Sequence, residues 1–495
     1  MGDGYDLLNQ PIPRLIRKIA VPTSVGYFFN TMFNVVDTFY GGMISTEALA
    51  ALSLCFPVFF LIISVGAGIS TGATALIGHA LGAGDKDGAR HLAGQTISFG
   101  LVHGVLVMLL GLWLAPRLFL VLGASGTVLS LALQYMNTVF AGSIFFLVNY
   151  VLNAILNATG DSRSFRNFLV GGFFLNLLLD PWFLYGGLGL PALGLPGIAL
   201  ATILVQASGN CYLLTRVKRS GMLTGFVWSE LIPGRRAYAE LAKQGFPSSL
   251  NMMTIATGIF VITWFVGRFG SDAVAGYGIA TRIEQIALLP VMGMNVAVLA
   301  LVAQNNGAHR LERVVETVWT ALRVGTVLMG AGTAAVFFLA RPLMGLFSSD
   351  STVIEIGVSY LRIEAFVLVA YIILYACVAV LQGLKRPVFP LAIGLLRQIV
   401  LPVPVFYLLA EVLGWGLAGI WWGIFGVTWG AACISLFYVG RMVSMLTSND
   451  ANGDHGGTPD GLCAKISQSG GAAVPEAVPQ RPPGDKAGES GAAWR

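Results

Sequence analysis

An acidic residue lies inside an apolar stretch near the start of the chain. The stretch Val21–Tyr40 is long enough to cross a bilayer core as a helix, and Asp37 is its one ionisable residue. A carboxylate at membrane depth costs roughly 2.5–3.5 kcal/mol on insertion scales, so it is kept where it faces a protein interior or a wet cavity. At helical spacing Asn30 and Asn34 share its face. We interpret this face as the inner wall of a polar cavity.

Further polar residues lie in three later apolar stretches. Asp180 follows Asn176 by four residues, so the two share a helix face. Two buried carboxylates close together can hold and release one proton near neutral pH, and the same oxygens can coordinate Na⁺. Each asparagine alone also fits plain interhelical hydrogen bonding, and Asp180 can instead bond backbone groups beside Pro181. The expected coupling site comprises Asn34, Asp37, Asn153, Asn157, Asn176, Asp180 and Thr202.

The second half of the chain carries ionisable residues of its own. If Glu284 lines a central cavity, its carboxylate attracts cationic cargo, and methionines form an adaptable apolar wall. The alternatives are pairing of Arg with Glu across helices, and ordinary helix packing for the apolar residues. The expected cavity residues are Tyr27, Met253, Glu284, Met292 and Phe366. The sequence leaves open whether cavity lining or pairing holds for Arg282, Glu284, Arg362, Glu364 and Arg397.

The composition indicates the class of protein that positions these residues. Of 495 residues 56% are hydrophobic and only 11% are charged, far below the roughly 25% of a soluble chain. The apolar stretches lie at roughly 15–40, 48–78, 93–114, 130–157, 167–186, 197–216, 246–268, 274–303, 316–340, 353–381, 388–410 and 418–440. We therefore predict an all-α polytopic membrane protein with twelve transmembrane helices.

The two halves of the chain repeat one another. Pro22 matches Pro247, Glu47 matches Asp272, and Gly82 matches Gly307, each pair 225 positions apart. Because each half has six spans, both copies share one orientation, and a parallel repeat with a cavity between two lobes is expected. The parts are a leader (1–13), a first six-helix lobe (14–220), a linker (221–245), a second six-helix lobe (246–446) and a disordered tail (447–495).

The repeat also shows where the halves differ. At the offset of 225, Asp37 corresponds to Ile262 and Asp180 to Val405. A role in lobe packing alone would more naturally be kept in both copies. The difference indicates that the first lobe holds the ion or proton site.

The Lys and Arg residues predict the topology. With the N-terminus inside, 18 of them fall in inside segments and 3 in outside loops, a bias that places both termini in the cytoplasm. The outside residues are Arg117, Arg268 and Arg341. We expect a multi-pass protein of a bacterial inner membrane, with the lipid bilayer as its surroundings and no nucleic acid as partner.

Motifs of other functions are absent from the sequence. There is no Walker A sequence for ATP hydrolysis, and no nucleophile–base arrangement of the kind an enzyme needs. The five cysteines and five histidines show no metal-ligand spacing. We expect neither an enzyme, nor a metal site, nor a cofactor beyond a coupling ion, H⁺ or Na⁺.

From about residue 12 to 441 the chain resembles the multidrug and toxic compound extrusion (MATE) family. The resemblance rests on the segments NVVDTFYGG (34–42), GHALGAGDKDGAR (78–90), LNAILNATGDSRS (152–164), NLLLDPWFLYGGLG (176–189), GIALAT (197–202) and GFPSSL (245–250). It implies two six-helix lobes around a cavity, and export of cationic or amphipathic compounds driven by inward H⁺ or Na⁺.

The resemblance also implies roles for individual residues. Asp37 matches the family's first-helix aspartate, Asn176 and Asp180 its fifth-helix pair, Thr202 its sixth-helix threonine, and Asn153 or Asn157 its fourth-helix asparagine. Glu284 is similar to an eighth-helix carboxylate of some members. The two carboxylates of the Na⁺-coupled branch fall near Ile255 and Tyr371, so that second-lobe site looks missing. This favours the proton-coupled branch that includes the DNA-damage-inducible F proteins.

Together these observations predict a monomeric antiporter that exports organic cations or amphiphiles against H⁺. Protonation of Asp37, coupled to Asp180, is expected to rearrange the first helix through Pro22 and Gly26. The nearest alternative is a lipid-linked oligosaccharide flippase of the same superfamily, which the arginines of the second half keep open. A channel-like or structural membrane protein gives no reason for polar residues in one half only.

Overall fold

The computed structural model describes residues 5–187 and 189–451, and residues 1–444 form one compact unit. The first half contains α1 (Ile12–Gly42), α2 (Thr46–Gly82), α3 (Lys86–Val121), α4 (Gly126–Ala141), α5 (Ser143–Ala158), α6 (Arg163–Tyr185) and α7 (Leu195–Arg219). The second half contains η1 (Trp228–Leu231), α8 (Arg235–Gly267), α9 (Ser271–Ala287), α10 (Leu289–Gly307), α11 (Leu311–Gly345), α12 (Ser351–Glu364), α13 (Val367–Gly383), α14 (Val388–Leu395), η2 (Leu396–Val400), α15 (Pro402–Phe406), η3 (Tyr407–Val412) and α16 (Gly416–Ala451).

The predicted spans are present. Among the described residues eight helices are long and apolar enough to cross a membrane, and three bent pairs raise the number to 11. The bent pairs are α4–α5 (47°), α9–α10 (42°) and α12–α13 (51°). The 31-residue α1 is the twelfth span, since 1.5 Å per residue gives it a length of about 46 Å. The all-α prediction is confirmed, and the chain is an integral membrane protein.

The predicted tail lies largely outside the described residues. The last helix, α16, continues to Ala451, a few residues into the segment predicted as tail, and residues 452–495 are not described. At the other end of the chain, α1 begins at Ile12, within the predicted leader.

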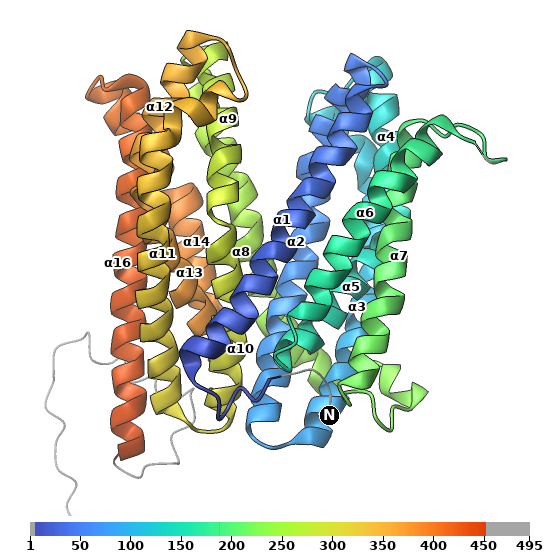
Figure 1. The fold of residues 1–495 in the computed structure, drawn as a ribbon, viewed down its shortest axis with the longest axis vertical. Helices are drawn as coiled ribbons and strands as arrows, with labels where there is room; N and C mark the ends of the chain where they lie inside the picture. The colour runs from blue at the N-terminus through green and yellow to red at the C-terminus, as the bar shows by residue number, and fades with distance from the viewer. Residues whose placement is uncertain (1–4, 188, 452–495) are drawn as a thin grey trace, which may run out of the picture. The chain divides into compact units, whose positions relative to one another are not determined.

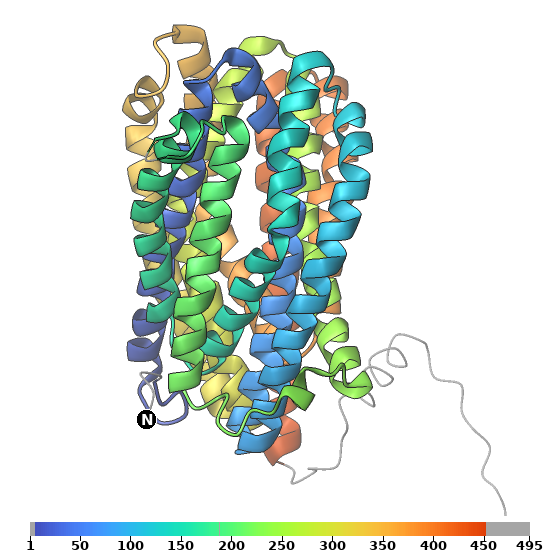
Figure 2. The same ribbon diagram turned by 90° about the vertical axis from the view of Figure 1, so that its right-hand side faces the viewer.

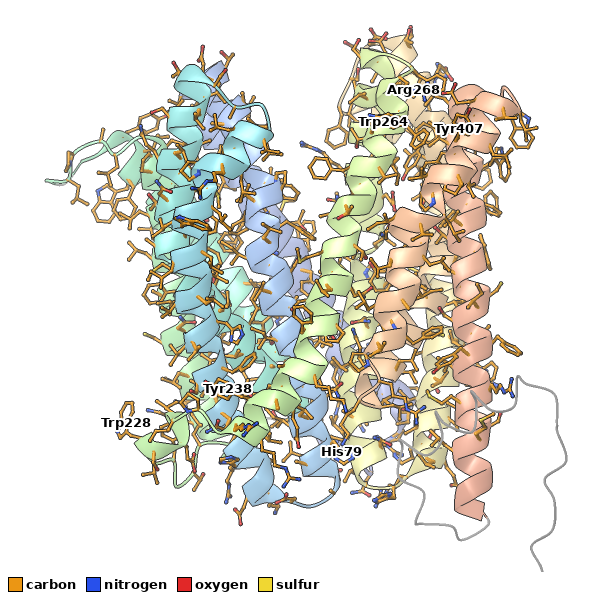
Figure 3. The ribbon with its side chains drawn as sticks, turned by 180° about the vertical axis from the view of Figure 1, so that it is seen from behind. His79, Trp228, Tyr238, Trp264, Arg268 and Tyr407 are labelled. Atoms are coloured by element: carbon orange, nitrogen blue, oxygen red, sulfur yellow. The ribbon has the colours of Figure 1, made fainter. Side chains whose placement is uncertain are left out.

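Two helices cross between the lobes. At one end of the bundle, called the basic end here, lie the α2–α3 and α10–α11 turns with Lys86 and Arg310 (Figure 1). α1 packs on α6 of the first lobe and on α10 of the second, while α6 and α7 run side by side (Figure 2). α8 packs on α14 of the second lobe and along α2 of the first. Figure 3 shows its Trp264 near Tyr407 in the second lobe, and Tyr238 at the basic end.

Reciprocal contacts confirm the internal repeat. A side chain on Gly68 would collide with Ser249, and one on Gly293 would collide with Ser24. These four residues form two pairs of repeat-equivalent positions, so each lobe presents the same close contact to the other. The same holds for Gly82 against the backbone of Gln304 and for Gly307 against that of His79. The lobes are therefore related by a parallel repeat with a twofold pattern of contacts.

The turns at the basic end repeat as well. Gly84 has φ 77° and Gly160 has φ 82°, and the equivalent positions hold His309 (φ 54°) and Lys385 (φ 60°). These two are the positive-φ residues other than glycine in the part of the chain described. A left-handed conformation is costly for residues with a Cβ. The backbone of the repeat is thus preserved even where the glycine is not.

Residues 5–11, the leader segment, are held by the second lobe. Leu7 is 1% exposed, and its carbonyl accepts hydrogen bonds from Asn305 Nδ2 and Arg313 Nη2 (both 3.3 Å). Arg313 Nη2 also donates to the Gln10 carbonyl (2.8 Å), and Arg310 Nη1 to that of Leu8 (2.7 Å). The chain before α1 therefore ties the first lobe to α10 and α11.

The linker before α8 makes the corresponding contact with the first lobe. Gln95 on α3 donates to the carbonyls of Glu230 (2.6 Å) and Ile232 (3.0 Å), and its Oε1 accepts from the Gly234 N–H (2.8 Å). α3 and α11 are equivalent helices of the repeat. Two tethers thus join the lobes at the basic end.

Candidate functional site

Asp37 lies at the centre of a polar cluster inside the first lobe. It is 9% exposed, on α1, one turn before the helix ends. Donors from three other helices point at its carboxylate: Tyr135 Oη of α4 (3.5 Å), Asn176 Nδ2 of α6 (3.4 Å) and Thr202 Oγ1 of α7 (3.4 Å). All three distances are long for hydrogen bonds. The carboxylate is therefore enclosed by donors that hold it loosely.

Asp180 is the second carboxylate of the cluster. Its side chain is 0% exposed, and neither of its oxygens has a donor among the described residues. Its carboxyl group lies close enough to that of Asp37 for one shared proton to join them. Burying an ionised carboxylate without partners is costly, so the pair calls for a proton or a cation.

The local sequence explains how α6 presents two polar groups to α1. Asn176 and Asp180 are one helical turn apart and therefore project to the same side. Pro181 follows Asp180 within the helix and lacks the N–H that would bond the Leu177 carbonyl. The Asn176 Oδ1 atom is also buried without a donor in the described chain. Three unpartnered oxygens, two from Asp180 and one from Asn176, are thus available to a small cation or a proton.

The structure does not bring every predicted coupling residue to this cluster. Asn153 and Asn157 follow Tyr135 by 18 and 22 residues in the α4–α5 pair, which is about 27–33 Å of helix. Their neighbour Asn149 donates to Gln206 (2.6 Å to Oε1), an interhelical contact of the packing kind. Asn34 donates to the Asn30 carbonyl of its own helix (3.4 Å). The expected placement of Asn153 and Asn157 around the Asp37 carboxylate is corrected accordingly, while Asn34, one turn before Asp37 on α1, stays a predicted member of the site.

Two predicted hinge residues lie at the basic end of α1. Pro22 has no N–H to bond the Lys18 carbonyl, and that carbonyl accepts from Ser162 Oγ instead (3.5 Å). A Cβ on Gly26 would meet the Arg166 Cα at 3.3 Å, so glycine lets α1 approach α6 closely. The structure thus gives both residues a packing role, and their role as a hinge stays a prediction.

The second lobe carries a polar cluster that brings together three of the ionisable residues whose role the sequence left open. Glu284 of α9 accepts a hydrogen bond from Tyr360 of α12 (2.6 Å), and Glu364, 2% exposed, lies one turn further along α12. Arg397 of η2 is 8% exposed and stacks over the Tyr371 ring (5.5 Å) within electrostatic reach of both glutamates. The second lobe therefore carries a carboxylate cluster of its own, built from Glu284 and Glu364, while the expected absence of carboxylates near Ile255 and Tyr371 stays a prediction.

This cluster also decides part of the open question about the arginines. Arg397 is buried beside Glu284 and Glu364, without a direct ion pair among the described residues. Arg282 and Arg362 are exposed, and the Arg362 guanidinium lies 5.7 Å from the Phe337 ring centre. Of these three arginines, only Arg397 therefore lies close to Glu284 and Glu364.

One of the expected cavity residues lies elsewhere, and the other apolar ones stay predictions. Met253 on α8 and Met292 on α10 are half-buried, as is Tyr27 on α1. Phe366 is a correction: it is 51% exposed and lines a pocket of about 340 Å³ between α11, α13 and α16. Phe366 was expected to be part of an apolar cavity wall, but it lies at the 51° bend between α12 and α13 with an exposed ring.

The tyrosines are the functional candidates that sequence reasoning passed over. Tyr135 and Tyr360 each reach a carboxylate, and Tyr371 lies beside Arg397. Tyr135 and Tyr360 are exactly one repeat apart, at an offset of 225, which is a signal that a search for repeated polar positions would have found.

Comparison with known proteins agrees with this architecture. The MatE family model matches residues 22–182 and 247–408, one match in each half. A FAD transporter of Shewanella oneidensis is 29% identical over 410 residues, covering 82% of this chain and 90% of the relative. A probable multidrug resistance protein NorM of Thermotoga maritima is 27% identical over 415 residues, covering 82% and 87%.

Solved structures show the same fold. A MOP superfamily transporter from Pyrococcus furiosus, described as having a binding pocket of reverse polarity, superposes with a TM-score of 0.84 at 27% identity. The superposition covers 90% of this chain and 99% of that one. An outward-facing multidrug resistance MATE family transporter gives the same TM-score, identity and coverage.

Proposed function

Since the chain belongs to the MatE family of transporters, we propose that it is a monomeric secondary antiporter that exchanges H⁺ for cationic or amphipathic small molecules. The observation that carries this proposal is Asp180, which is fully buried beside Asp37 with no donor to either oxygen among the described residues. A group in this position is stable only when it is neutralised. Proton uptake and release at the pair can therefore drive a change of conformation.

The donors around Asp37 suggest how protonation acts on the fold. α4, α6 and α7 each contribute one hydrogen bond to the Asp37 carboxylate on α1. A proton on Asp37 removes the negative charge that these donors face, and it weakens their hold on α1. We propose that α1 then rearranges about Pro22 and Gly26, the cavity contracts, and cargo leaves on the outer side.

Sodium is the second candidate for the coupling ion. Carboxylate and amide oxygens of Asp37, Asp180 and Asn176 lie together, and the Asn176 Oδ1 has no donor among the described residues. Oxygen ligands suit a hard cation as well as a proton. H⁺ is preferred here because two neighbouring buried carboxyl groups can share one proton, whereas the described chain offers no further carboxylate at this site to complete the coordination of Na⁺.

We propose that the basic end faces the cytoplasm of a bacterial cell, with both termini inside and the chain in the inner membrane. The distribution of Lys and Arg supports this orientation. Cationic cargo is favoured by Glu284, a half-buried carboxylate of the second lobe. A flippase is less well supported, because Arg362 is on the periphery and Arg397 is buried with two glutamates.

Transport by reconstituted protein tests this proposal. Ethidium export from proteoliposomes would be followed under an imposed ΔpH and, separately, under a Na⁺ gradient. We expect ΔpH to drive export, Asp37→Asn and Asp180→Asn to abolish it, and Asp350→Asn, which alters only a helix cap, to leave it near the wild-type rate. Export driven by Na⁺ alone would overturn the ion assignment. A panel that includes flavin dinucleotide would show whether anionic cargo is preferred, and that result would overturn the substrate class.

A further inference from the structure

The pocket of about 340 Å³ is lined by none of the carboxylates of the two clusters, although its Phe425 and Trp429 pack with Tyr371 of the second-lobe cluster. It is lined by Gly330 and Thr333 of α11, Phe366 and Val369 at the start of α13, and Trp422, Phe425 and Trp429 of α16. The Thr333 hydroxyl donates a hydrogen bond to the Ala365 carbonyl (2.6 Å), so the walls of the pocket are almost wholly apolar. Such a pocket accepts a hydrocarbon chain and gives no reason to hold a hydrated ion.

The helices around the pocket present apolar side chains to the bilayer. On α11, Val327 is 76% exposed and Phe338 is 77% exposed, and on α16 Phe437 is 71% exposed. α11 and α16 lie next to one another at the edge of the second lobe (Figure 1). In an integral membrane protein these faces meet lipid. The pocket therefore opens where acyl chains are the surrounding solvent.

One charged residue lies on the same helix face as the pocket. Arg362 precedes Phe366 by four residues, and the Phe337 ring links them, 5.7 Å from the guanidinium and 5.7 Å from the Phe366 ring. Arg362 is exposed, and no anion of the described chain pairs with it. An unpaired arginine at membrane depth is costly. An anion supplied by the bilayer removes that cost.

A buried donor lies at a similar depth. Trp429 Nε1 is buried and has no acceptor among the described residues. Counting along the helices, Arg362 lies about 16 Å from the start of α12 and Trp429 about 20 Å from the start of α16. Trp429 and Phe366 line the same pocket, and the Phe337 ring joins Phe366 to Arg362. A ligand whose anionic group pairs with Arg362 can therefore also supply the acceptor for the Trp429 indole N–H.

We propose that this pocket is a binding site for an anionic phospholipid. Arg362 pairs with the phosphate, the Trp429 indole donates to an ester oxygen, and one acyl chain lies between Phe366, Trp422 and Phe425. The leaflet concerned is the one at the end opposite the basic end, because Arg362 lies in α12, whose N-cap, Asp350, is at that end. The site does not depend on the proposed direction or ion of transport.

Quenching of tryptophan fluorescence by brominated lipids tests the site. The protein would be reconstituted in phosphatidylcholine with a fixed fraction of phosphatidylglycerol, the bromines placed on the acyl chains of one lipid or the other. The fluorescence of Trp422 and Trp429 is obtained by subtracting the fluorescence of a Trp422→Phe/Trp429→Phe double variant from that of the wild-type protein. We expect brominated phosphatidylglycerol to quench this difference signal at least twofold more strongly than brominated phosphatidylcholine at equal mole fraction.

Matched variants separate charge from shape. Arg362→Gln is expected to abolish the preference for the anionic lipid, while Arg117→Gln, which removes an exposed arginine stacked on Trp113 in the first lobe, keeps it. Gly330→Leu places a side chain in open space within the pocket and is expected to reduce quenching by either lipid. Gly440→Leu, at an equally open site outside the pocket, leaves it unchanged. Equal quenching by both lipids, or a preference for the anionic lipid that persists in Arg362→Gln, would overturn the proposal. The pocket would then hold only boundary lipid that binds without selectivity for its head group.

Discussion

Tyr135 on α4 and Tyr360 on α12 lie 225 positions apart, and each donates its hydroxyl proton to a carboxylate, Asp37 in the first lobe and Glu284 in the second. The tyrosine is shared by the two halves, but the carboxylates come from non-equivalent helices, α1 and α9. The Asp37 contact is 3.5 Å long and that of Glu284 is 2.6 Å. The same donor therefore holds its partner loosely in one lobe and firmly in the other.

This difference predicts different outcomes for removing the two hydroxyls. Tyr360→Phe leaves Glu284 without its short hydrogen bond, and a hydrogen bond to a charged group contributes about 1.5–3 kcal/mol. We expect a loss of stability of that size, measured by thermal unfolding of the purified protein. Tyr135→Phe should change stability by less than about 1 kcal/mol, because its bond is long. An equal loss in both variants would contradict the assignment.

Removing asparagines one at a time tests the geometry of the coupling site. Asn176→Ala deletes a donor to Asp37 and is expected to reduce ΔpH-driven export at least tenfold. Asn157→Ala, equally buried but many turns away, should keep most of the export rate. Initial rates in proteoliposomes, normalised to reconstituted protein, give the comparison. Loss of coupling in Asn157→Ala would show that the site extends along α5.

The glycine contacts between the lobes predict a sensitive interface at the basic end. Gly82→Ala directs a methyl group into the Gln304 carbonyl, and backbone cannot swing aside as a flexible side chain can. We expect the lobes to separate there, visible as a longer spin-label distance between α2 and α10. Gly171→Ala, on α6 with open space around it, is the control. An unchanged distance in Gly82→Ala would show that the helices relax without parting.

The leader segment is predicted to loosen when its arginine is removed. Arg313→Gln deletes hydrogen bonds to the carbonyls of Leu7 and Gln10, so a cysteine at position 7, buried in the wild-type fold, should react with maleimide several-fold faster. The background is a variant lacking the exposed Cys211 and Cys433 and also Cys463. Arg236→Gln, an exposed arginine of α8, is the control. Unchanged labelling would mean that burial of Leu7 alone holds the segment.

Acid should act on the same segment. The hydrogen bond from the Asn9 side chain lowers the pKa of Asp6 below its ordinary value, helped by the N–H groups of Leu8 and Asn9. A lowered pKa means that the stabilisation is present above the ordinary value and is lost as the pH falls through the lowered one. Labelling at position 7 should therefore rise below about pH 4, and Asp6→Asn should remove that pH dependence.

Much of the fold follows from the sequence alone. The twelve spans and the repeat were predictable because apolar length and a shared offset are visible residue by residue, whereas the bends of three spans were not predicted. Asp37, Asn176, Asp180 and Thr202 were also predictable, since polar residues are rare at membrane depth and each stands out singly.

The second-lobe cluster could not be predicted in the same way. Glu284, Glu364 and Arg397 come from three helices whose relative rotation only the packed structure fixes. Glu364 follows Arg362 by two residues, yet the helix turns one inward and the other towards lipid. Glu284 and Asp37 are not at equivalent positions of the repeat, so the offset of 225 gives no signal for the second cluster. Asn157 is the opposite case. It belongs to a motif that predicted a place beside Asp37, but its position near the end of α5 puts it far from that carboxylate.

The paired contacts of Gly68 with Ser249 and of Ser24 with Gly293 have the symmetry of a dimer of identical subunits. Each half sends its first helix, α1 or α8, across to the other, as in an exchange of segments between two protomers. A chain cut within 222–226, between α7 and η1, would then yield two polypeptides that interlock without a covalent link. The interface between the two halves of this one chain thus has the symmetry that an interface between two identical six-helix subunits would have.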